Sequence, residues 1–176
     1  MPASADPPPA SSPASVAELF AGGARPRCYI ASPLGFTEPG RAYYSERYVP
    51  ALTAHVEPVD PWTLSLPEEF AAARADGREH AFGIEVGERN ATAIRGSQLL
   101  IAQLDGQEID AGTASEVGYA AALGLPCLGV RTDLRVTGEP GMRLNLQLEA
   151  FVVLSGGFVA GSLQELVARL ARLRAG

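Results

Sequence analysis

Four carboxylates gather in a short stretch that follows an apolar run near the middle of the sequence. They are Asp105, Glu108, Asp110 and Glu116, and the apolar run covers residues 99–104. A carboxylate can act as a nucleophile, and a second one can act as a general acid or base. Acid chemistry is therefore the first hypothesis to test at this junction.

The same carboxylates have a structural explanation that requires no chemistry. Thr113 and Glu116 have the spacing of a capping box, in which Glu116 would bond the backbone amide of the cap residue. Asp110 would then be an ordinary loop acid, favoured by the positive end of the helix dipole. Capping boxes are common and carboxylate catalysts are rare, so both interpretations stay open here.

The elements around this junction are those of a parallel α/β sheet. Residues 99–104 are short, apolar and followed by Asp105 and Gly106, which predicts a strand buried on both faces. Apolar residues then recur at helical spacing as far as Leu123, and Gly124 supplies a stop. Ligands of open α/β sheets bind at the carboxyl ends of the strands, where the acidic loop would lie.

Strands and helices alternate along the rest of the chain. The predicted strands share short apolar or β-branched runs bounded by turn residues, and they cover residues 27–32, 56–60, 99–104, 126–130 and 150–154. The predicted helices share an apolar stripe, and they cover residues 39–55 with an interruption at Pro50, 66–97 with a break near 76–77, 113–123, and 163–173. The helix before the third strand has an apolar face at Ile84, Gly87, Ala91 and Ile94, which we expect to cover the sheet.

This alternation without an internal repeat predicts a doubly wound parallel sheet in three layers, with five strands in the flavodoxin-like order 2-1-3-4-5. Strands 1 and 3 would flank the switch point of that sheet. Tyr29 and the loop at 105–116 should then share one cleft.

Composition and charge limit the classes of partner. The 176 residues and the 47% hydrophobic content suit one domain with a sizeable core. The formal charge of −6, with no Lys/Arg cluster, opposes a nucleic acid polymer as partner. Cys28 and Cys127 fall in predicted buried strands without a Cys-x-x-Cys motif, which favours buried thiols in a reducing cytoplasm. His55 and His80 have no partner at ligand spacing, so no metal site is expected.

Residues 1–26 differ in composition from the rest of the chain. They hold six of the 14 prolines among Ala, Ser and Gly, which predicts a disordered tail and leaves residues 27–176 as the folded domain. The tail lacks the basic start and apolar stretch of a secretory signal, and no later apolar run is long enough for a membrane span. We therefore expect a cytoplasmic protein without a membrane partner.

Four blocks resemble, in order, those of the nucleoside 2-deoxyribosyltransferase family. The blocks are Cys28-Tyr29-Ile30-Ala31-Ser32-Pro33-Leu34-Gly35-Phe36, then Glu88-Arg89-Asn90-x-x-x-Ile94, then Asp110-x-Gly112-Thr113-x-x-Glu116-x-Gly118, and Arg143-Leu144-Asn145-Leu146. The match covers roughly residues 27–154, and the combination is far more specific than any single block. The resemblance implies that residues 27–176 form a catalytic domain similar to those of nucleoside 2-deoxyribosyltransferases.

The resemblance implies transfer of 2-deoxyribose between nucleobases without a cofactor. A carboxylate captures the sugar covalently and a second base then attacks it, so that two inversions give retention, while water attacks more slowly when no base is bound. The resemblance implies Glu116 as the nucleophile and Asp110 as the acid or hydrogen-bond partner of the base. Tyr29 matches a tyrosine that bonds the catalytic carboxylate and crowds the 2′ side of the sugar.

Substrate-binding roles are implied for four further residues. Phe36 matches an aromatic residue near the base, Asn90 a position that hydrogen-bonds base or sugar, and Gly112 a residue of the acidic-loop signature. Asn145 matches an asparagine that reaches into a neighbouring subunit to bind the 5′-hydroxyl of the sugar. A homo-oligomer, either a dimer or a hexamer with shared active sites, is therefore expected. From its position alone, Asn145 could equally be a turn residue that bonds its own backbone.

Two other functions stay open. An N-glycosidase for 2′-deoxynucleoside 5′-monophosphates would need a phosphate-binding loop after the first strand, whereas Ser32 is the one hydroxyl there and Pro33 lacks an amide donor. A non-catalytic nucleotide-binding module would use the carboxylates only for capping and solvation. Trp62, the single tryptophan, is explained either by packing or by stacking on a nucleobase.

Overall fold

The computed structural model describes residues 15–176, in which the strands form one parallel sheet. The strand order is β2-β1-β3-β4-β5, and the bounds are β1 Arg27–Ala31, β2 Glu57–Val59, β3 Leu99–Gln103, β4 Cys127–Val130 and β5 Val159–Ala160. The predicted doubly wound α/β fold is therefore confirmed, with β1 and β3 on either side of the switch point.

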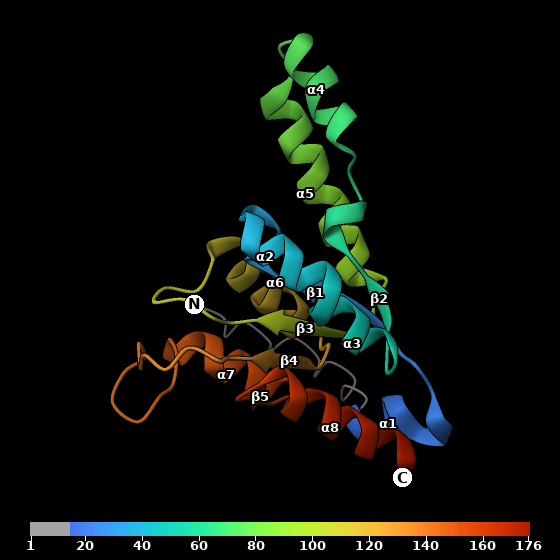
Figure 1. Ribbon diagram of the computed structural model, residues 1–176, viewed down its shortest axis with the longest axis vertical. Helices are drawn as coiled ribbons and strands as arrows, with labels where there is room; N and C mark the ends of the chain where they lie inside the picture. The colour runs from blue at the N-terminus through green and yellow to red at the C-terminus, as the bar shows by residue number, and fades with distance from the viewer. Residues whose placement is uncertain (1–14) are drawn as a thin grey trace, which may run out of the picture.

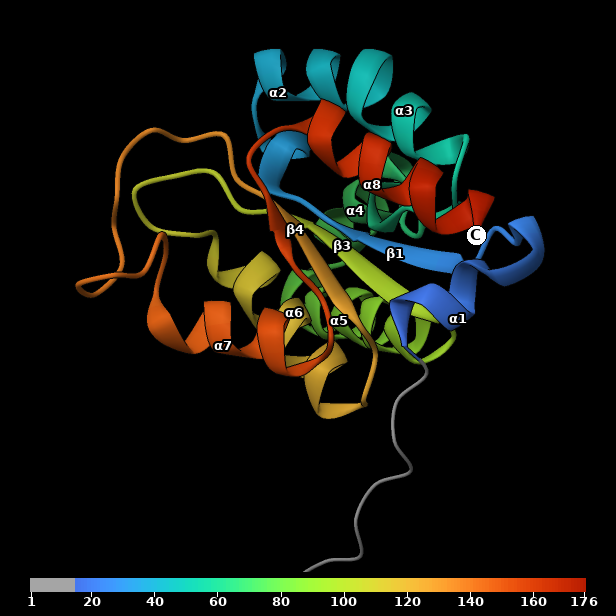
Figure 2. The ribbon, with the colours of Figure 1, turned by 90° about the horizontal axis from the view of Figure 1, so that it is seen from below.

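Helices cover both faces of this sheet. They are α1 Val16–Phe20, α2 Glu38–Tyr43, α3 Val49–Thr53, α4 Pro67–Ala75, α5 Glu79–Arg95, α6 Ala111–Ala122, α7 Leu146–Leu154 and α8 Leu163–Ala175. Figure 2 shows α3 and α8 on one side of the strands and α5, α6 and α7 on the other. No helix within residues 15–176 is both long and apolar enough to cross a membrane.

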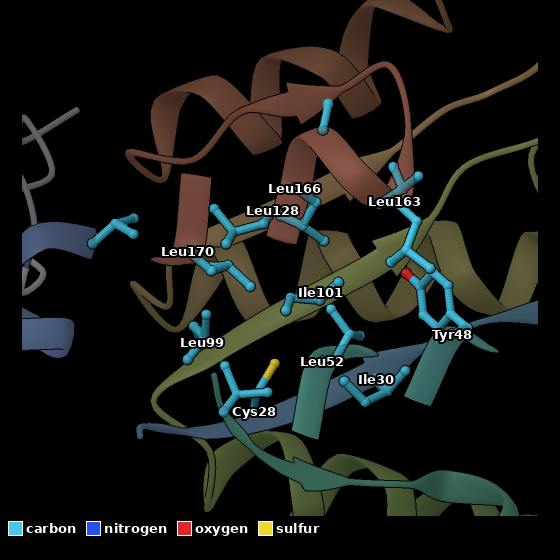
Figure 3. Close-up of a cluster of buried hydrophobic side chains, with 14 of the residues drawn as sticks. Cys28, Ile30, Tyr48, Leu52, Leu99, Ile101, Leu128, Leu163, Leu166 and Leu170 are labelled. Carbon is cyan, nitrogen blue, oxygen red and sulfur yellow. The ribbon is translucent and has the colours of Figure 1, made fainter. Parts of the chain in front are cut away.

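Alternate residues of β1 serve the two faces of the sheet. Cys28 and Ile30 pack beneath α3 and α8, in the cluster that Figure 3 shows together with Leu52 and Leu166. Tyr29 points the other way, into the core that includes residues of α5, α6 and α7. The side chain of Tyr29 is therefore directed toward α6, which begins just after the acidic loop.

The helix predicted at 39–55 runs on without the expected interruption at Pro50. A π-helical turn at Tyr44–Tyr48 joins α2 to α3, and Pro50 stands in the first turn of α3. The wider π-helical turn thus lies directly before Pro50, which has no amide hydrogen to donate to the preceding turn. Short 3-10 turns lie elsewhere, at Ala21–Gly23, Pro33–Phe36 and Pro61–Thr63.

The strand predicted at residues 150–154 is wrong, because this segment belongs to α7. Asn145 caps the helix by accepting hydrogen bonds from the backbone amides of Gln147 and Leu148. Leu148 and Val152, four residues apart, are then buried on one face of the helix. The last strand follows Gly156 and Gly157 and is only β5, Val159–Ala160.

The second half of the predicted disordered tail also differs from the expectation. Ser15 and Glu18 form a capping box at the start of α1, and Val16 and Phe20 are buried against the core that includes α8. Burial of these two apolar side chains provides the stabilisation that composition alone did not indicate. Residues 1–14 lie outside the described residues.

The pair of helices α4 and α5 projects from the body of the domain, as Figure 1 shows at the top of the view. The break between them lies where the sequence predicts it, near Asp76 and Gly77. The predicted sheet-covering face of α5 is correct only for its last turns, because Ile94 is 2% exposed whereas Ile84 is 64% exposed. Phe82 of α5 packs instead on Phe70 of α4, with ring centroids 4.8 Å apart.

Candidate active site

A cavity of about 290 Å³ opens beside the loops that follow β1, β2 and β3. Cavities of about 300 Å³ are at the lower end of small-molecule sites. It is lined by Ser32, Phe36, Pro61, Trp62, Ser65, Phe70, Val86, Asn90, Asp110, Gly112, Thr113 and Glu116. The cavity therefore lies where the strand order predicts a ligand site, and most of the predicted site residues line it.

Tyr29 and Glu116 are in direct contact at this cavity. The Tyr29 hydroxyl donates a hydrogen bond to Glu116 Oε1 at 2.6 Å, although the two residues are 87 positions apart in the chain. The contact arises because β1 directs Tyr29 toward α6, and Glu116 lies in the second turn of that helix. The structure thus brings this predicted pair together, while the catalytic roles of both residues stay predictions.

The start of α6 differs from the predicted capping box. The N-cap is Asp110, whose Oδ2 accepts hydrogen bonds from the Thr113 amide at 2.8 Å and from the Thr113 hydroxyl at 3.0 Å. The capping interpretation of Glu116 is wrong, because its carboxylate is bonded to Tyr29 instead of a cap residue. Asp110 also lines the cavity, and its Oδ1 makes no hydrogen bond with any residue of the described chain.

The surroundings of Glu116 disfavour its charged form. Burial raises the pKa of Glu116 from 4.5 to about 7; the Tyr29 hydrogen bond opposes this rise, and the Asp110 charge adds to it. Burial also raises the pKa of Tyr29, and the Glu116 charge adds to that effect, so Tyr29 remains a hydrogen-bond donor. A carboxyl group that titrates near neutral pH in a cavity is a typical feature of functional sites.

Asn90 contributes an unpaired acceptor to the cavity. It lies on α5, and its Oδ1 is buried without a hydrogen-bond partner among residues 15–176. A buried acceptor left unpaired costs about 1–3 kcal/mol. An N–H or O–H donor of a ligand could remove this cost.

The mouth of the cavity carries an aromatic pair, which we call the aromatic wall and which consists of Phe36 and Trp62. Their ring centroids are 4.8 Å apart and the ring planes meet at 81°, an edge-to-face arrangement. Phe36 is 68% exposed and Trp62 is 39% exposed, so both rings have free surface for a planar ligand. Trp62 therefore both packs against a neighbour and lines the cavity.

Several lining residues were not predicted from the sequence. Phe70 and Val86 reach the cavity from the projecting helices α4 and α5, and Pro61 and Ser65 come from the segment after β2. For Phe70 and Val86 the only signal in the sequence was apolar helical spacing. That spacing does not reveal that α4 and α5 border the cavity.

The other two acids of the loop lie outside the cavity. Asp105 accepts hydrogen bonds from the backbone amides of Thr132 and Asp133, which ties the acidic loop to the loop after β4. The buried Arg131 side chain reinforces this tie by donating to the carbonyl oxygens at the start of the acidic loop. Glu108 is exposed. Asp105 thus positions the loop that leads to Asp110.

Two predicted site residues do not line the cavity: Tyr29 is fully buried and reaches it only through Glu116, and Asn145 lies away from it. Asn145 is exposed at the start of α7 and caps that helix through its Oδ1. The next residue, Leu146, is 49% exposed, and Leu134 and Val136 in the loop that precedes α7 are 98% and 74% exposed. Asn145 therefore does not meet Glu116 within one chain.

The charged side chains that line the cavity are all acidic. Glu116 and Asp110 line it, and no Lys, Arg or His of the described residues does. Residues 15–176 hold no group of three His, Cys, Asp or Glu side chains that could bind a metal ion. The two free cysteines, Cys28 and Cys127, are buried in β1 and β4.

The sequence of this chain, which places Tyr29, Asp110 and Glu116 at this cavity, also matches a known family model. The model for nucleoside 2-deoxyribosyltransferase matches residues 28–153. The chain belongs to the nucleoside 2-deoxyribosyltransferase family. Members of this family act on nucleosides and nucleobases as glycosyl-transferring or glycosidase enzymes.

Solved structures share the fold of this family member. A 2-deoxyribosyltransferase from Bacillus psychrosaccharolyticus is 21% identical with a TM-score of 0.60, over 82% of this chain and 95% of that chain. A conserved protein from Enterococcus faecalis is 24% identical with a TM-score of 0.57, over 85% and 99% of the two chains. The CMP N-glycosidase BcmB of Clostridium botulinum is 14% identical with a TM-score of 0.51, over 83% and 98%. A search of curated proteins finds no match.

Proposed function

We propose that this enzyme transfers 2-deoxyribose from one nucleobase to another through a covalent intermediate on Glu116. The hydrogen bond of 2.6 Å between Tyr29 and Glu116, at the wall of a cavity that no Lys, Arg or His of residues 15–176 lines, carries this proposal. It leaves the second carboxylate oxygen of Glu116 without a partner among the described residues. A fixed carboxylate with one free oxygen suits attack on a sugar carbon.

In the first half-reaction, Glu116 attacks C1′ of the deoxynucleoside as the C1′–N bond breaks. The electron pair of that bond goes to the leaving base, and Asp110 donates its proton to the base and becomes a carboxylate. The attacking form is the carboxylate, which predominates above the pKa of about 7. The Tyr29 hydroxyl stabilises the negative charge of the carboxylate through a charge-assisted hydrogen bond and fixes the orientation of the carboxylate.

In the second half-reaction, a nitrogen of another base attacks C1′ and loses its proton to Asp110. The ester bond to Glu116 breaks and its electron pair returns to the carboxylate. Two inversions at C1′ give overall retention. Water can replace the acceptor base, with free deoxyribose as the product.

The remaining cavity residues suit a nucleoside. Phe36 and Trp62 offer aromatic surface to the base, and Asn90 offers its unpaired oxygen to an N–H or O–H donor. Gly112 lies beside Asp110, where an added Cβ would come within 3.1 Å of Asp110 Oδ2. We assign the aromatic wall and Asn90 to base binding and Gly112 to the approach of the sugar.

Charge favours neutral nucleosides over nucleoside monophosphates. A phosphate in this cavity would meet two carboxylates and no cationic side chain of the described residues. The Ser32 hydroxyl already accepts a hydrogen bond from the Leu34 amide, and Pro33 lacks an amide donor. These features disfavour an N-glycosidase for monophosphates. A binding module without catalysis would not need a buried carboxyl group held by a tyrosine.

We also propose that two subunits share each active site. Asn145 stands exposed at the start of α7, and the loop and helix on either side of it expose the apolar side chains of Leu134, Val136 and Leu146. This surface suits contact with a second copy of the chain, which would receive Asn145 in its cavity to bind the sugar 5′-hydroxyl. The proposal requires at least a dimer.

Incubation of a deoxynucleoside with a different free base, followed by chromatography, tests the function. We expect the new deoxynucleoside from the wild type and none from Glu116→Ala or Glu116→Gln that has folded normally. Incubation with a deoxynucleoside monophosphate is the matched comparison. Release of base from the monophosphate without exchange between nucleosides would contradict the proposal in favour of the glycosidase.

A further inference from the structure

Asp60, which follows β2, connects the mouth of the cavity to the core of the domain. Its Oδ1 accepts one hydrogen bond from the Tyr44 hydroxyl at 2.8 Å and another from the Trp62 amide at 3.0 Å. The Asp60 backbone oxygen accepts from the amide and the hydroxyl of Thr63. These bonds define the 3-10 turn Pro61–Thr63, which carries Trp62.

Tyr44 is a rigid support for this carboxylate. It is 6% exposed, and its ring stacks on that of Tyr48 with centroids 6.0 Å apart and planes at 19°. Both tyrosines belong to the π-helical turn Tyr44–Tyr48, and their rings pack in the core that contains Ile30 and Leu52. Single π turns inside helices occur frequently at functional sites. The Tyr44 hydroxyl therefore reaches Asp60 from a part of the fold that cannot easily move.

Trp62 is held from its other side by the loop after β1. An added Cβ on Gly35 would lie 2.2 Å from Trp62 Cε2, so the indole ring rests directly on the backbone of Gly35. The edge of Phe36 completes the contact at 4.8 Å between centroids. The aromatic wall is thus set by Gly35 on one side and by the Tyr44–Asp60 hydrogen bond on the other.

We propose that Tyr44 and Asp60 are positioning residues for the aromatic wall, and that this wall decides whether the deoxyribosyl group passes to a base or to water. The proposal rests on the proposed function. Both acceptors attack the same C1′ atom and release Glu116, so the ratio of their rates depends on how each is held. A base must be oriented against a surface, whereas water needs only access. An aromatic wall that is fixed in place orients the base for attack and limits the access of water to C1′, so it favours transfer over hydrolysis.

The test measures new deoxynucleoside and free deoxyribose in the same reaction, at a fixed concentration of acceptor base. In Tyr44→Phe we expect hydrolysis relative to transfer to rise on the order of tenfold, within the range for loss of one hydrogen bond to a charged group. Asp60→Ala should give a similar rise, and Trp62→Ala a larger one. A purely structural role would lower both products together and leave their ratio unchanged.

Two matched variants serve as controls. Tyr43→Phe removes the hydroxyl of the adjacent tyrosine, which makes no hydrogen bond within residues 15–176, so the ratio should stay at the wild-type value. Asp60→Asn keeps the oxygen that accepts from Tyr44 and Trp62, and it should stay close to wild type. If Tyr44→Phe does not fold, Asp60→Ala compared with Asp60→Asn gives the same answer.

The outcomes separate this inference from the function on which it rests. Wild-type exchange combined with an unchanged ratio in Tyr44→Phe, Asp60→Ala and Trp62→Ala would overturn the inference and leave the proposed function intact. A wild type that exchanges no base would overturn both. A raised ratio in Tyr43→Phe equal to that in Tyr44→Phe would also count against the specific role of Tyr44.

Discussion

Glu116→Gln should abolish transfer and, at alkaline pH, make the protein more stable. Burial raises the pKa of Glu116 to about 7, against 4.5 for the solvated group. Between pH 4.5 and pH 7, the carboxyl group of Glu116 is mostly ionised in the unfolded chain and mostly protonated in the folded chain. Ionisation therefore favours unfolding, and wild-type stability should fall as the pH rises from 4.5 to 7, with the full cost present above 7.

The size of this cost follows from the two pKa values. Their difference, 7 minus 4.5, multiplied by 1.36 kcal/mol per pH unit gives about 3 kcal/mol. In a domain of this size, about 3 kcal/mol corresponds to roughly 6–12 °C in Tm. The glutamine side chain keeps an oxygen that can accept from the Tyr29 hydroxyl, so the variant loses the charge and retains the hydrogen bond.

Denaturant unfolding of wild type and Glu116→Gln at pH 5 and pH 8 measures the effect. The stability of the variant relative to the wild type should rise by about 2–3 kcal/mol from pH 5 to pH 8, because a small part of the cost is already present at pH 5. Glu108→Gln, which alters an exposed acid of the same loop, should show the same change in unfolding free energy between pH 5 and pH 8 as the wild type. An equal change in the free energy of unfolding with pH for wild type and Glu116→Gln would refute the reasoning, because Glu116 would then be equally solvated in the folded and unfolded states.

Four further results are expected. Tyr29→Phe should lose about 0.5–3 kcal/mol of transition-state stabilisation, and the acid limb of its pH–rate profile should move to higher pH, because the lost hydrogen bond lowers the pKa of Glu116. Wild-type kcat/KM should be clearly higher on deoxyadenosine than on adenosine, and equal values would contradict the crowding of the 2′ carbon by Tyr29. A mixture of inactive Glu116→Ala and inactive Asn145→Ala should regain activity as subunits exchange, whereas a mixture that stays inactive after confirmed exchange would rule out shared sites. Phe20→Ala should cost about 3–5 kcal/mol in denaturant unfolding, because Phe20 is fully buried, and an unchanged midpoint would show that α1 is not docked.

The features that could be predicted are those set by patterns along the chain. Apart from Arg27 and Gln103 at their ends, the runs that became β1, β3 and β4 are apolar, as strands buried on both faces require. The alternation of these strands with helices then favoured the observed strand order. Because strands 1 and 3 flank the switch point, the meeting of Tyr29 with the acidic loop also followed.

The errors arose where two local alternatives compete or where tertiary contacts decide the outcome. The segment 150–154 has a composition that suits a strand or a helix, and the cap supplied by Asn145 selects the helix. Thr113 and Asp110 could each cap α6, and the helix begins at the earlier one, which leaves Glu116 for Tyr29. Phe70 and Val86 line the cavity only because α4 and α5 project beside it, which no local pattern indicates.

The central claim is that Glu116 becomes covalently bound to the sugar, and mass spectrometry of a quenched reaction tests it most directly. The enzyme is mixed with a deoxynucleoside in the absence of acceptor base, quenched in acid within the first turnovers, and digested. We predict a peptide that contains Glu116 and has gained the mass of one deoxyribosyl group, and its absence in Glu116→Gln. Base exchange at wild-type rate by Glu116→Ala, or an adduct on a peptide without Glu116, would contradict the account.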